Sequence, residues 1–180
     1  MSYTQSGGFV VGKTLNNGYP GNISRSADAI ITNRPVRSTD TASIPFGAPV
    51  VLNGNNTYSL FGASNVAADF AGVAIREVQQ ATTYFPATGG SYAPGQPCDV
   101  AERGSLTVNC TEGTPASGGA VYIVTVAGTG AVSAVGDFIA IATPAGTSSA
   151  AVEVTNAQWK SVGVDANGVA ELTILSRNKA

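Results

Sequence analysis

The 180-residue sequence contains no histidine and few charged side chains. Lysine, arginine, aspartate and glutamate make up 11% of the chain, compared with about 25% in a typical soluble domain. Without histidine, the chain cannot form the Ser-His or Cys-His pairs that activate many nucleophiles, and it lacks the commonest side-chain ligand of transition metals. We therefore expect a protein that is not an enzyme and that binds no cofactor or metal.

Cysteine is also scarce, with only Cys98 and Cys110 in the chain. Two cysteines are too few for a structural zinc site by themselves, and free cysteines are among the most buried residue types. Thiols stay reduced in a cytoplasm, so we expect both to be small, buried, apolar side chains. A disulfide between them across a hairpin remains an open alternative.

Long apolar runs are missing as well. No segment approaches the roughly 18 apolar residues of a membrane-spanning helix. Residues 1–8 are polar and glycine-rich, unlike a secretory signal. We expect a soluble protein that is assembled in a cytoplasm and has no membrane partner.

The few charges are distributed unevenly. Residues 1–40 contain four basic and two acidic side chains, whereas the rest of the chain is acidic and has no basic residue between Arg103 and Lys160. A nucleic-acid interface needs lysine and arginine clustered on one face. We therefore expect no nucleic-acid partner.

The pattern of residues changes near position 43. Residues 1–43 are rich in glycine and proline, show no helical period, and contain only short apolar runs at 9–11 and 29–31. We expect an extended N-terminal arm over 1–43, ordered by lying on its own body or on a neighbouring subunit. Residues 44–180 contain short β-type segments separated by turn residues, which predicts an all-β body, a single antiparallel β-barrel or sandwich of jelly-roll-like type.

Alternation of apolar and polar residues, with turn residues between, locates the strands. The segment 169–176 should direct Ala170, Leu172 and Ile174 into the core. We expect hairpin turns at 53–54 and 167–168, and single helical turns at 65–69 and 156–159. The expected strands are Pro49–Leu52, Thr57–Leu60, Phe70–Glu77, Cys98–Ala101, Ser105–Asn109, Ala120–Val126, Asp137–Ala142, Ala150–Val154, Lys160–Val164 and Val169–Ser176.

Two motifs invite a chemical interpretation. Residues 7–14 match the phosphate-binding pattern G-x-x-x-x-G-K-[ST], but no strand precedes them and the following residues cannot continue as a helix. Asp99 with Glu102 or Glu112 could form the carboxylate pair of a glycosidase. Each lies beside a turn signal, so solvated loop positions explain them better. Trp159, the only tryptophan, is expected to anchor the core.

Four segments, taken in order, resemble the structural cement or decoration proteins of tailed bacteriophages. They are Ile44–Val50, Phe70–Ala74, Tyr92–Val100 and Gly104–Val108, preceded by the glycine- and proline-containing run Gly18–Ser24. The resemblance implies a non-enzymatic protein on the outer capsid surface of a virion assembled in a bacterial cytoplasm. Its partners would be the major capsid protein, whose neighbouring subunits it would bridge to stabilise the shell, and further copies of itself in a homotrimer or homodimer. The alternative is a β-structured tail or fibre module that recognises a host glycan.

Aromatic, aliphatic and arginine side chains in the arm and the loops are candidates for contact with the capsid or with another subunit. Such residues are enriched at interfaces, and the basic arm would suit an acidic capsid face. For the loop aromatics, covering the body's own core is an equally good interpretation. The predicted contacts are Phe9, Val10, Tyr19, Arg25, Ile30, Ile31, Arg34, Arg37, Tyr84, Phe85 and Tyr92.

Overall fold

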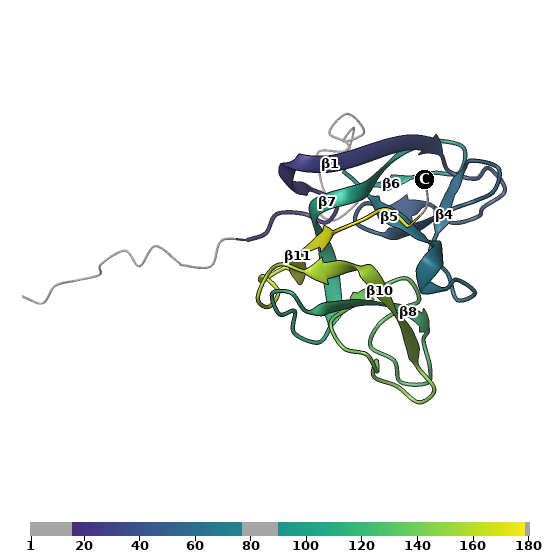
Figure 1. Cartoon of the computed structure of the whole chain (residues 1–180). Helices are drawn as coiled ribbons and strands as arrows, with labels where there is room; N and C mark the ends of the chain where they lie inside the picture. Colours follow the sequence, from purple (N-terminus) through teal and green to yellow (C-terminus); the bar gives the residue numbers. More distant parts are fainter. Residues whose placement is uncertain (1–15, 77–89, 179–180) are drawn as a thin grey trace, which may run out of the picture.

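The computed structural model describes residues 16–76 and 90–178, which form an all-β structure with one short 3-10 turn. Figure 1 shows two lobes, one above the other, with the long strand β7 running between them. The strands are β1 Ile23–Pro35, β2 Ile44–Pro45, β3 Pro49–Leu52, β4 Tyr58–Leu60, β5 Phe70–Ala74, β6 Ser91–Tyr92, β7 Pro97–Glu112, β8 Ala120–Val126, β9 Phe138–Ile139, β10 Ala150–Trp159 and β11 Val169–Ile174, and the 3-10 turn η1 is Ala67–Asp69.

The lower lobe is a closed barrel of five strands. Its order is β11, β10, β8, β9 and β7, and the ring closes because β11 also pairs with β7. All neighbours are antiparallel except β7 and β9, which are parallel, so the barrel is mixed. Closure removes the unpaired edges that would otherwise invite aggregation. The predicted all-β barrel is thus confirmed, with one parallel pair added.

The upper lobe is built on the first half of β7. β7 pairs with β5, β5 pairs with β3, and β3 pairs with β4. β1 also pairs with β7, outside this strand order. A bridge between Val36 and Tyr58 brings the end of β1 back to β4. The short pair β2 and β6 lies beside this group. The lobes therefore share one covalent strand and cannot move independently without bending it.

The buried side chains form two hydrophobic clusters, a smaller one in the upper lobe and a larger one that fills the barrel and extends to Val51 of β3 and to Phe70 and Val73 of β5. Cys98 and Val100 of β7 face the upper core, whereas Leu106 and Val108 of the same strand face the lower one. All four positions are even-numbered, so the alternation continues through Gly104, which lies between the two pairs and has a φ of +115°. A Cβ at this position would lie 3.0 Å from the Cα of Ala29. Glycine permits both the positive φ and the close approach of β1.

Several sequence expectations match the structure. β3 and β8 have the predicted bounds, and η1 lies within the helical turn expected at 65–69. Ala170, Leu172 and Ile174 are all buried, as the alternation predicted. The two segments expected at 98–101 and 105–109 are one continuous strand, because β1 pairs with β7 over residues 97–103 and β11 pairs with it over residues 104–109.

The predicted strand at 160–164 and the predicted helical turn at 156–159 are wrong. β10 continues to Trp159, since Ala157 pairs with Ile174 of β11 and the Asn156 side chain donates to the carbonyl of Ser176. Residues 160–164 belong to the loop before β11. The turn expected at 167–168 is present, and the amide of Gly168 donates to the carbonyl of Asp165.

Part of the expected arm lies on its own chain. β1 pairs with β7 from Pro35 opposite Pro97 back to Ile23 opposite Leu106. Residues 1–15, which include the phosphate-loop match at 7–14, lie outside the described residues. The division of the chain at residue 43 stays a prediction, to which the structure adds that β1 contributes a strand to the sheet.

The two cysteines and the only tryptophan are buried, as expected. Cys98 and Cys110 are both free and buried, and Trp159 is 1% exposed within the lower core. Burial raises the pKa of the Cys98 thiol to about 12 and also raises that of Cys110. Both thiols are therefore protonated and unreactive near neutral pH.

Candidate interaction surfaces

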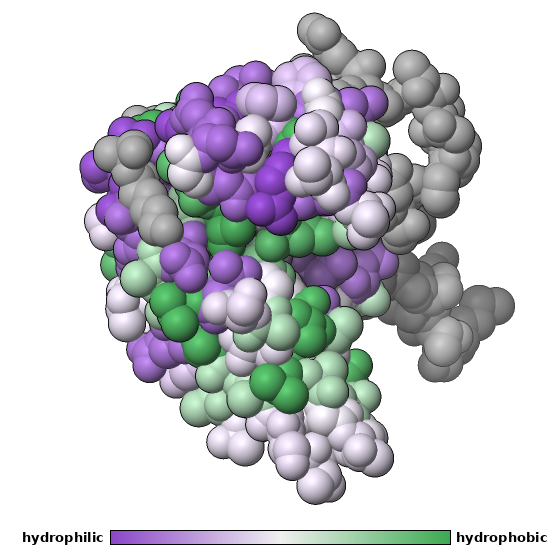
Figure 2. Space-filling model, turned by 90° about the vertical axis from the view of Figure 1, so that its right-hand side faces the viewer, coloured by the Kyte–Doolittle hydropathy of each residue, from purple (hydrophilic) through white to green (hydrophobic). Residues whose placement is uncertain are grey.

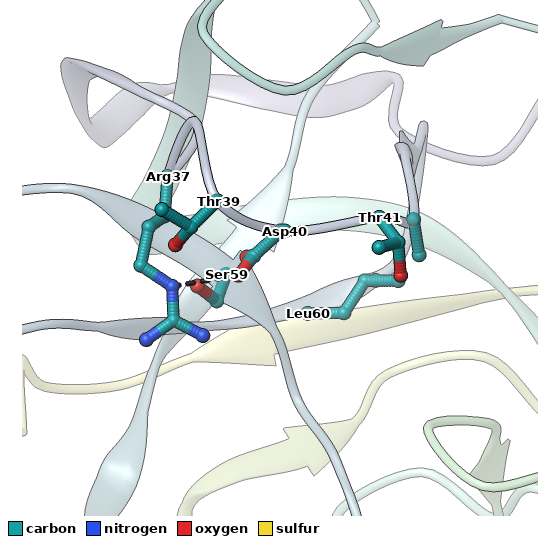
Figure 3. A pocket seen from close by; sticks show the side chains of 7 residues that line it. Arg37, Thr39, Asp40, Thr41, Ser59 and Leu60 are labelled. Atoms are coloured by element: carbon teal, nitrogen blue, oxygen red, sulfur yellow. Dashed lines mark hydrogen bonds and ion pairs between the residues drawn. The ribbon is translucent and has the colours of Figure 1, made fainter.

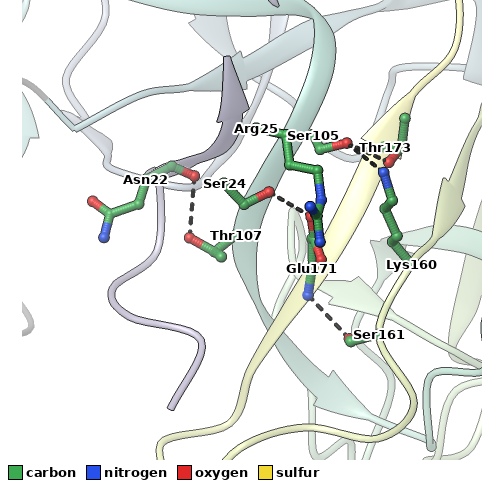
Figure 4. A network of polar contacts seen from close by, with 9 residues as sticks. All are labelled: Asn22, Ser24, Arg25, Ser105, Thr107, Lys160, Ser161, Glu171 and Thr173. Atoms are coloured by element: carbon green, nitrogen blue, oxygen red, sulfur yellow. Dashed lines mark hydrogen bonds and ion pairs between the residues drawn. The ribbon is translucent and has the colours of Figure 1, made fainter. Parts of the chain in front are cut away.

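A polar network fixes the start of the described chain onto the lower barrel. The hydroxyl of Ser24 donates to Oε1 of Glu171 at 2.6 Å, and Arg25 Nε lies 3.5 Å from the same oxygen (Figure 4). Thr107 of β7 donates to the carbonyls of Tyr19 and Asn22. The Arg25 side chain remains 68% exposed, so this predicted contact residue can reach a partner.

The other predicted contacts on β1 lie toward its end. Ile31 is 44% exposed and Ile30 is half-buried. Arg34 donates to the side-chain carbonyl of Asn56, and its guanidinium lies 5.8 Å from the ring centroid of Tyr58. These partners of Arg34 are neutral, so its positive charge is not cancelled by them.

A shallow polar hollow follows the end of β1. Its volume is about 310 Å³, and its lining comes from the loop after β1 and from β4 (Figure 3). The exposed Arg37 donates from Nε to Asp40 at 2.6 Å, so its charge is already paired. The remaining lining side chains are Thr39, Thr41, Ala42, Ser59 and Leu60. This set offers hydroxyls for binding but no acid-base pair for catalysis.

The two predicted aromatic contacts in the described residues differ in exposure. Tyr19 is 42% exposed, with the guanidinium of Arg76 at 4.8 Å from its ring. Tyr92 is fully buried, and its hydroxyl donates to the carbonyl of Ile75 at 2.8 Å. Tyr92 is therefore a core residue, and its prediction as a surface contact is corrected. The remaining predicted contacts, Phe9, Val10, Tyr84 and Phe85, lie outside the described residues.

The assignment of Glu102 to a solvated loop is wrong. Its side chain is 1% exposed at the base of the upper core, where it accepts a hydrogen bond from the hydroxyl of Tyr58 at 3.0 Å and forms an ion pair with Arg177. Burial, and then the charge of Glu102, raise the pKa of Tyr58 above its usual value. Sequence reasoning missed this pair because 75 residues separate its two members.

Glu112 also has a structural role. Its carboxylate accepts hydrogen bonds from the Ser133 hydroxyl at 3.1 Å and from the Ala145 amide at 2.6 Å. It thereby holds together the small-residue loops after β8 and β9, which also share a bridge between Thr129 and Thr147. Figure 2 shows the contrast between the lobes, with hydrophilic residues gathered on the upper lobe and weakly polar or hydrophobic ones on the lower.

A comparison with known families identifies the family of the chain. The model of the family described as "Structural cement protein (E217 gp24/Pam3 gp6)" matches residues 9–175. The chain belongs to the phage structural cement protein family. This cement protein is accordingly a structural, non-enzymatic component of a phage.

A solved structure shares the fold of the cement protein. A chain from "The capsid of Myoviridae Phage XM1" superposes with a TM-score of 0.65 at 16% identity, over 97% of this chain and 99% of that one. At that identity the likeness concerns the fold. No match was found among the curated proteins.

Two kinds of feature are absent from the described part of the cement protein. Residues 16–76 and 90–178 contain no cluster of three or more side chains able to hold a metal ion. No helix within those ranges is long and apolar enough to cross a membrane.

Proposed function

We propose that this cement protein binds the outer surface of a phage capsid and bridges neighbouring major capsid protein subunits, which stabilises the shell. The observation that carries the proposal is the family match over residues 9–175. The solved chain that shares the fold comes from a phage capsid, which supports the same location. The protein would act there after assembly in a bacterial cytoplasm.

The shape of the body suits a bridge. A protein that connects two subunits must transmit force between separate contacts, and this requires a rigid link between them. Here both lobes are built on the single strand β7, and the ion pair between Glu102 and Arg177 ties the chain terminus of the lower barrel to the upper core. Motion of one lobe is therefore transmitted to the other.

The outer side of β1 is the contact surface that we propose for the shell. Ile31 supplies an exposed apolar side chain there. Arg34, three positions further along, lies on the other side of the strand, half-buried over the ring of the fully buried Tyr58. Arg25 lies near the start of β1, and Arg37 lies just after its end. Each forms an ion pair with a carboxylate of this chain, which an acidic side chain of the capsid could replace. Arginine is one of the residues that contribute most to binding energy at interfaces, and the buried core of an interface is more apolar than its rim.

We further propose that the protein acts as a homodimer or homotrimer. A capsid presents many equivalent sites, and an oligomer that engages several of them gains affinity by avidity without any new kind of contact. Modest individual interfaces would then suffice.

The test is cryo-electron microscopy of the protein mixed with undecorated capsids, with occupancy measured for two matched variants. Ile31→Asp should lower the affinity at least tenfold, because a charge replaces an apolar contact at about 1.4 kcal/mol or more. Val162→Asp, at a position that is 83% exposed on the lower lobe, should bind as the wild type.

Density joining two capsid subunits supports the proposal, and density on one subunit alone refutes bridging. Bare capsids at saturating protein would refute capsid binding and would direct attention to a tail or fibre module, for which glycan arrays are the assay. Equal losses for both variants would show that β1 is not the contact surface.

A further inference from the structure

A groove at the junction of the two lobes is lined by prolines, an aromatic ring and one carboxylate. Its volume is about 220 Å³. One wall is the turn that follows β2, at residues 45–49, together with Pro20, and the other is formed by Asn109 and residues 136–138 at β9. The groove therefore lies between the upper lobe and the lower barrel.

The lining selects an apolar ligand with one positive charge. Three of its residues, Pro20, Pro45 and Pro49, have no backbone N–H to offer and are conformationally rigid. Phe46 adds an aromatic ring, and Asp137 is the only ionisable side chain in the lining. One oxygen of Asp137 accepts from the amide of Ala134 at 2.9 Å, so the other oxygen is available to a cation.

One segment of this chain has the matching composition. Phe9-Val10-Val11 is followed by Gly12 and then by Lys13, so three apolar side chains precede one cation by a single glycine. This segment lies outside the described residues. Residues 77–89 also lie outside the described residues, but they contain Glu77 and no lysine or arginine.

We propose that residues 9–13 of one copy bind the junction groove of a second copy, with the apolar side chains on the proline walls and Lys13 at Asp137. Residues 1–15 span up to roughly 50 Å when extended, which is enough to reach a neighbour. Each copy would give one arm and receive another, so the exchange closes into a symmetric oligomer. The arm then serves contacts between copies, and β1 is left for the shell.

The attachment of the described chain favours a neighbour's groove over the chain's own. The amide of Asn17 donates to Oδ2 of Asp165 at 2.7 Å, and its side chain donates to the carbonyl of Val169. Tyr19 is held beneath Arg76. For residues 9–13 to bind the groove of their own chain, which Pro20 lines, the chain would have to reverse direction within residues 14–16.

Disulfide trapping between two separately purified variants tests the exchange. Val11→Cys places a thiol on the arm, and Ala48→Cys places one in the groove lining. Mixing them under a mild oxidant such as diamide should yield a covalent dimer, resolved on a non-reducing gel. The native Cys98 and Cys110 are buried and do not compete.

The matched control replaces Ala48→Cys with Ser117→Cys, an exposed position in the loop before β8. We expect trapping in the groove to be at least about tenfold faster than this control, because docking raises the effective concentration of the thiols to the millimolar range. Adding Lys13→Glu to the arm variant should slow trapping at least about threefold, whereas Lys13→Arg should not.

Other outcomes would overturn the exchange. Trapping no faster than the Ser117→Cys control means that the arm does not occupy the groove. A Val11→Cys/Ala48→Cys double variant that closes on itself, while the mixed single variants stay monomeric, means that the arm binds its own chain. Because the experiment uses free protein, its result is independent of whether the protein binds capsids.

Discussion

Replacing Arg177 with methionine should expose how much the upper lobe depends on the C-terminal residues. Arg177 forms an ion pair with Glu102, whose side chain is 1% exposed, while that of Arg177 is 36% exposed. Methionine preserves most of the aliphatic stem, so the change removes mainly the charge. The carboxylate of Glu102 would then keep only the Tyr58 hydroxyl as a described hydrogen-bond donor.

The expected loss is set by the burial of the two partners. Removing one member of a fully buried ion pair costs about 3–5 kcal/mol, because the other charge is left uncompensated. Water can partly replace Arg177 at its exposed position, so we expect a loss of about 2–3 kcal/mol in the free energy of unfolding. For a chain of this size that corresponds to a fall of about 4–12 °C in Tm.

A double-mutant cycle measures the coupling energy between Arg177 and Glu102. The free energy of unfolding is obtained by urea titration at pH 7 for four proteins. The proteins are the wild type, Arg177→Met, Glu102→Gln and the double variant. In the Glu102→Gln background no charge remains to be compensated, so Arg177→Met should cost less than about 1 kcal/mol. An equal cost in both backgrounds would refute the assigned ion pair as the source of stability.

Two further predictions concern β7. Gly104→Ala should destabilise the fold by about 1–3 kcal/mol, since alanine disfavours a φ of +115° and its Cβ would press on Ala29. Urea titration measures the free energy of unfolding. The control is Gly95→Ala, at a φ of +83° with open space around it, which measures the cost of the positive φ without a steric clash. Because burial raises the Cys98 pKa from 9.0 to about 12, the folded state binds the proton more tightly than the unfolded state. The stability from this thiol should be complete below about pH 9 and lost as the pH rises toward 12; Cys98→Ala should flatten this decline, and an unchanged profile would contradict it.

The local patterns of the sequence were enough to recover much of the architecture. Strands β3 and β8 have their predicted bounds, because alternation with a period of two and flanking turn residues act over a few neighbours. The turn at Gly168 was predictable for the same reason, since it depends on a positive φ at one position. The order of the segments between Ile44 and Val108 pointed to the cement family, which the family match over residues 9–175 confirms.

The candidate contact surfaces were only partly predictable. Tyr92 stands in a loop-like sequence and was predicted as a contact, yet it is fully buried because the Ile75 carbonyl accepts its hydroxyl hydrogen bond within the upper core. The exposure of Ile31 and Arg25 agrees with a surface role. The sequence could not predict it, because both sides of β1 contain polar and apolar residues and the pattern does not indicate which side faces solvent.

By itself, the sequence determined the fold class, the core face of β11 and the turns, because each of these depends on neighbouring residues. Only the tertiary structure decided that β7 continues through Gly104 to serve two cores, that β1 lies on it, and that Glu102 is buried against Arg177. These features join residues far apart in the chain, and their energy arises from burial and pairing that exist only after the chain has folded.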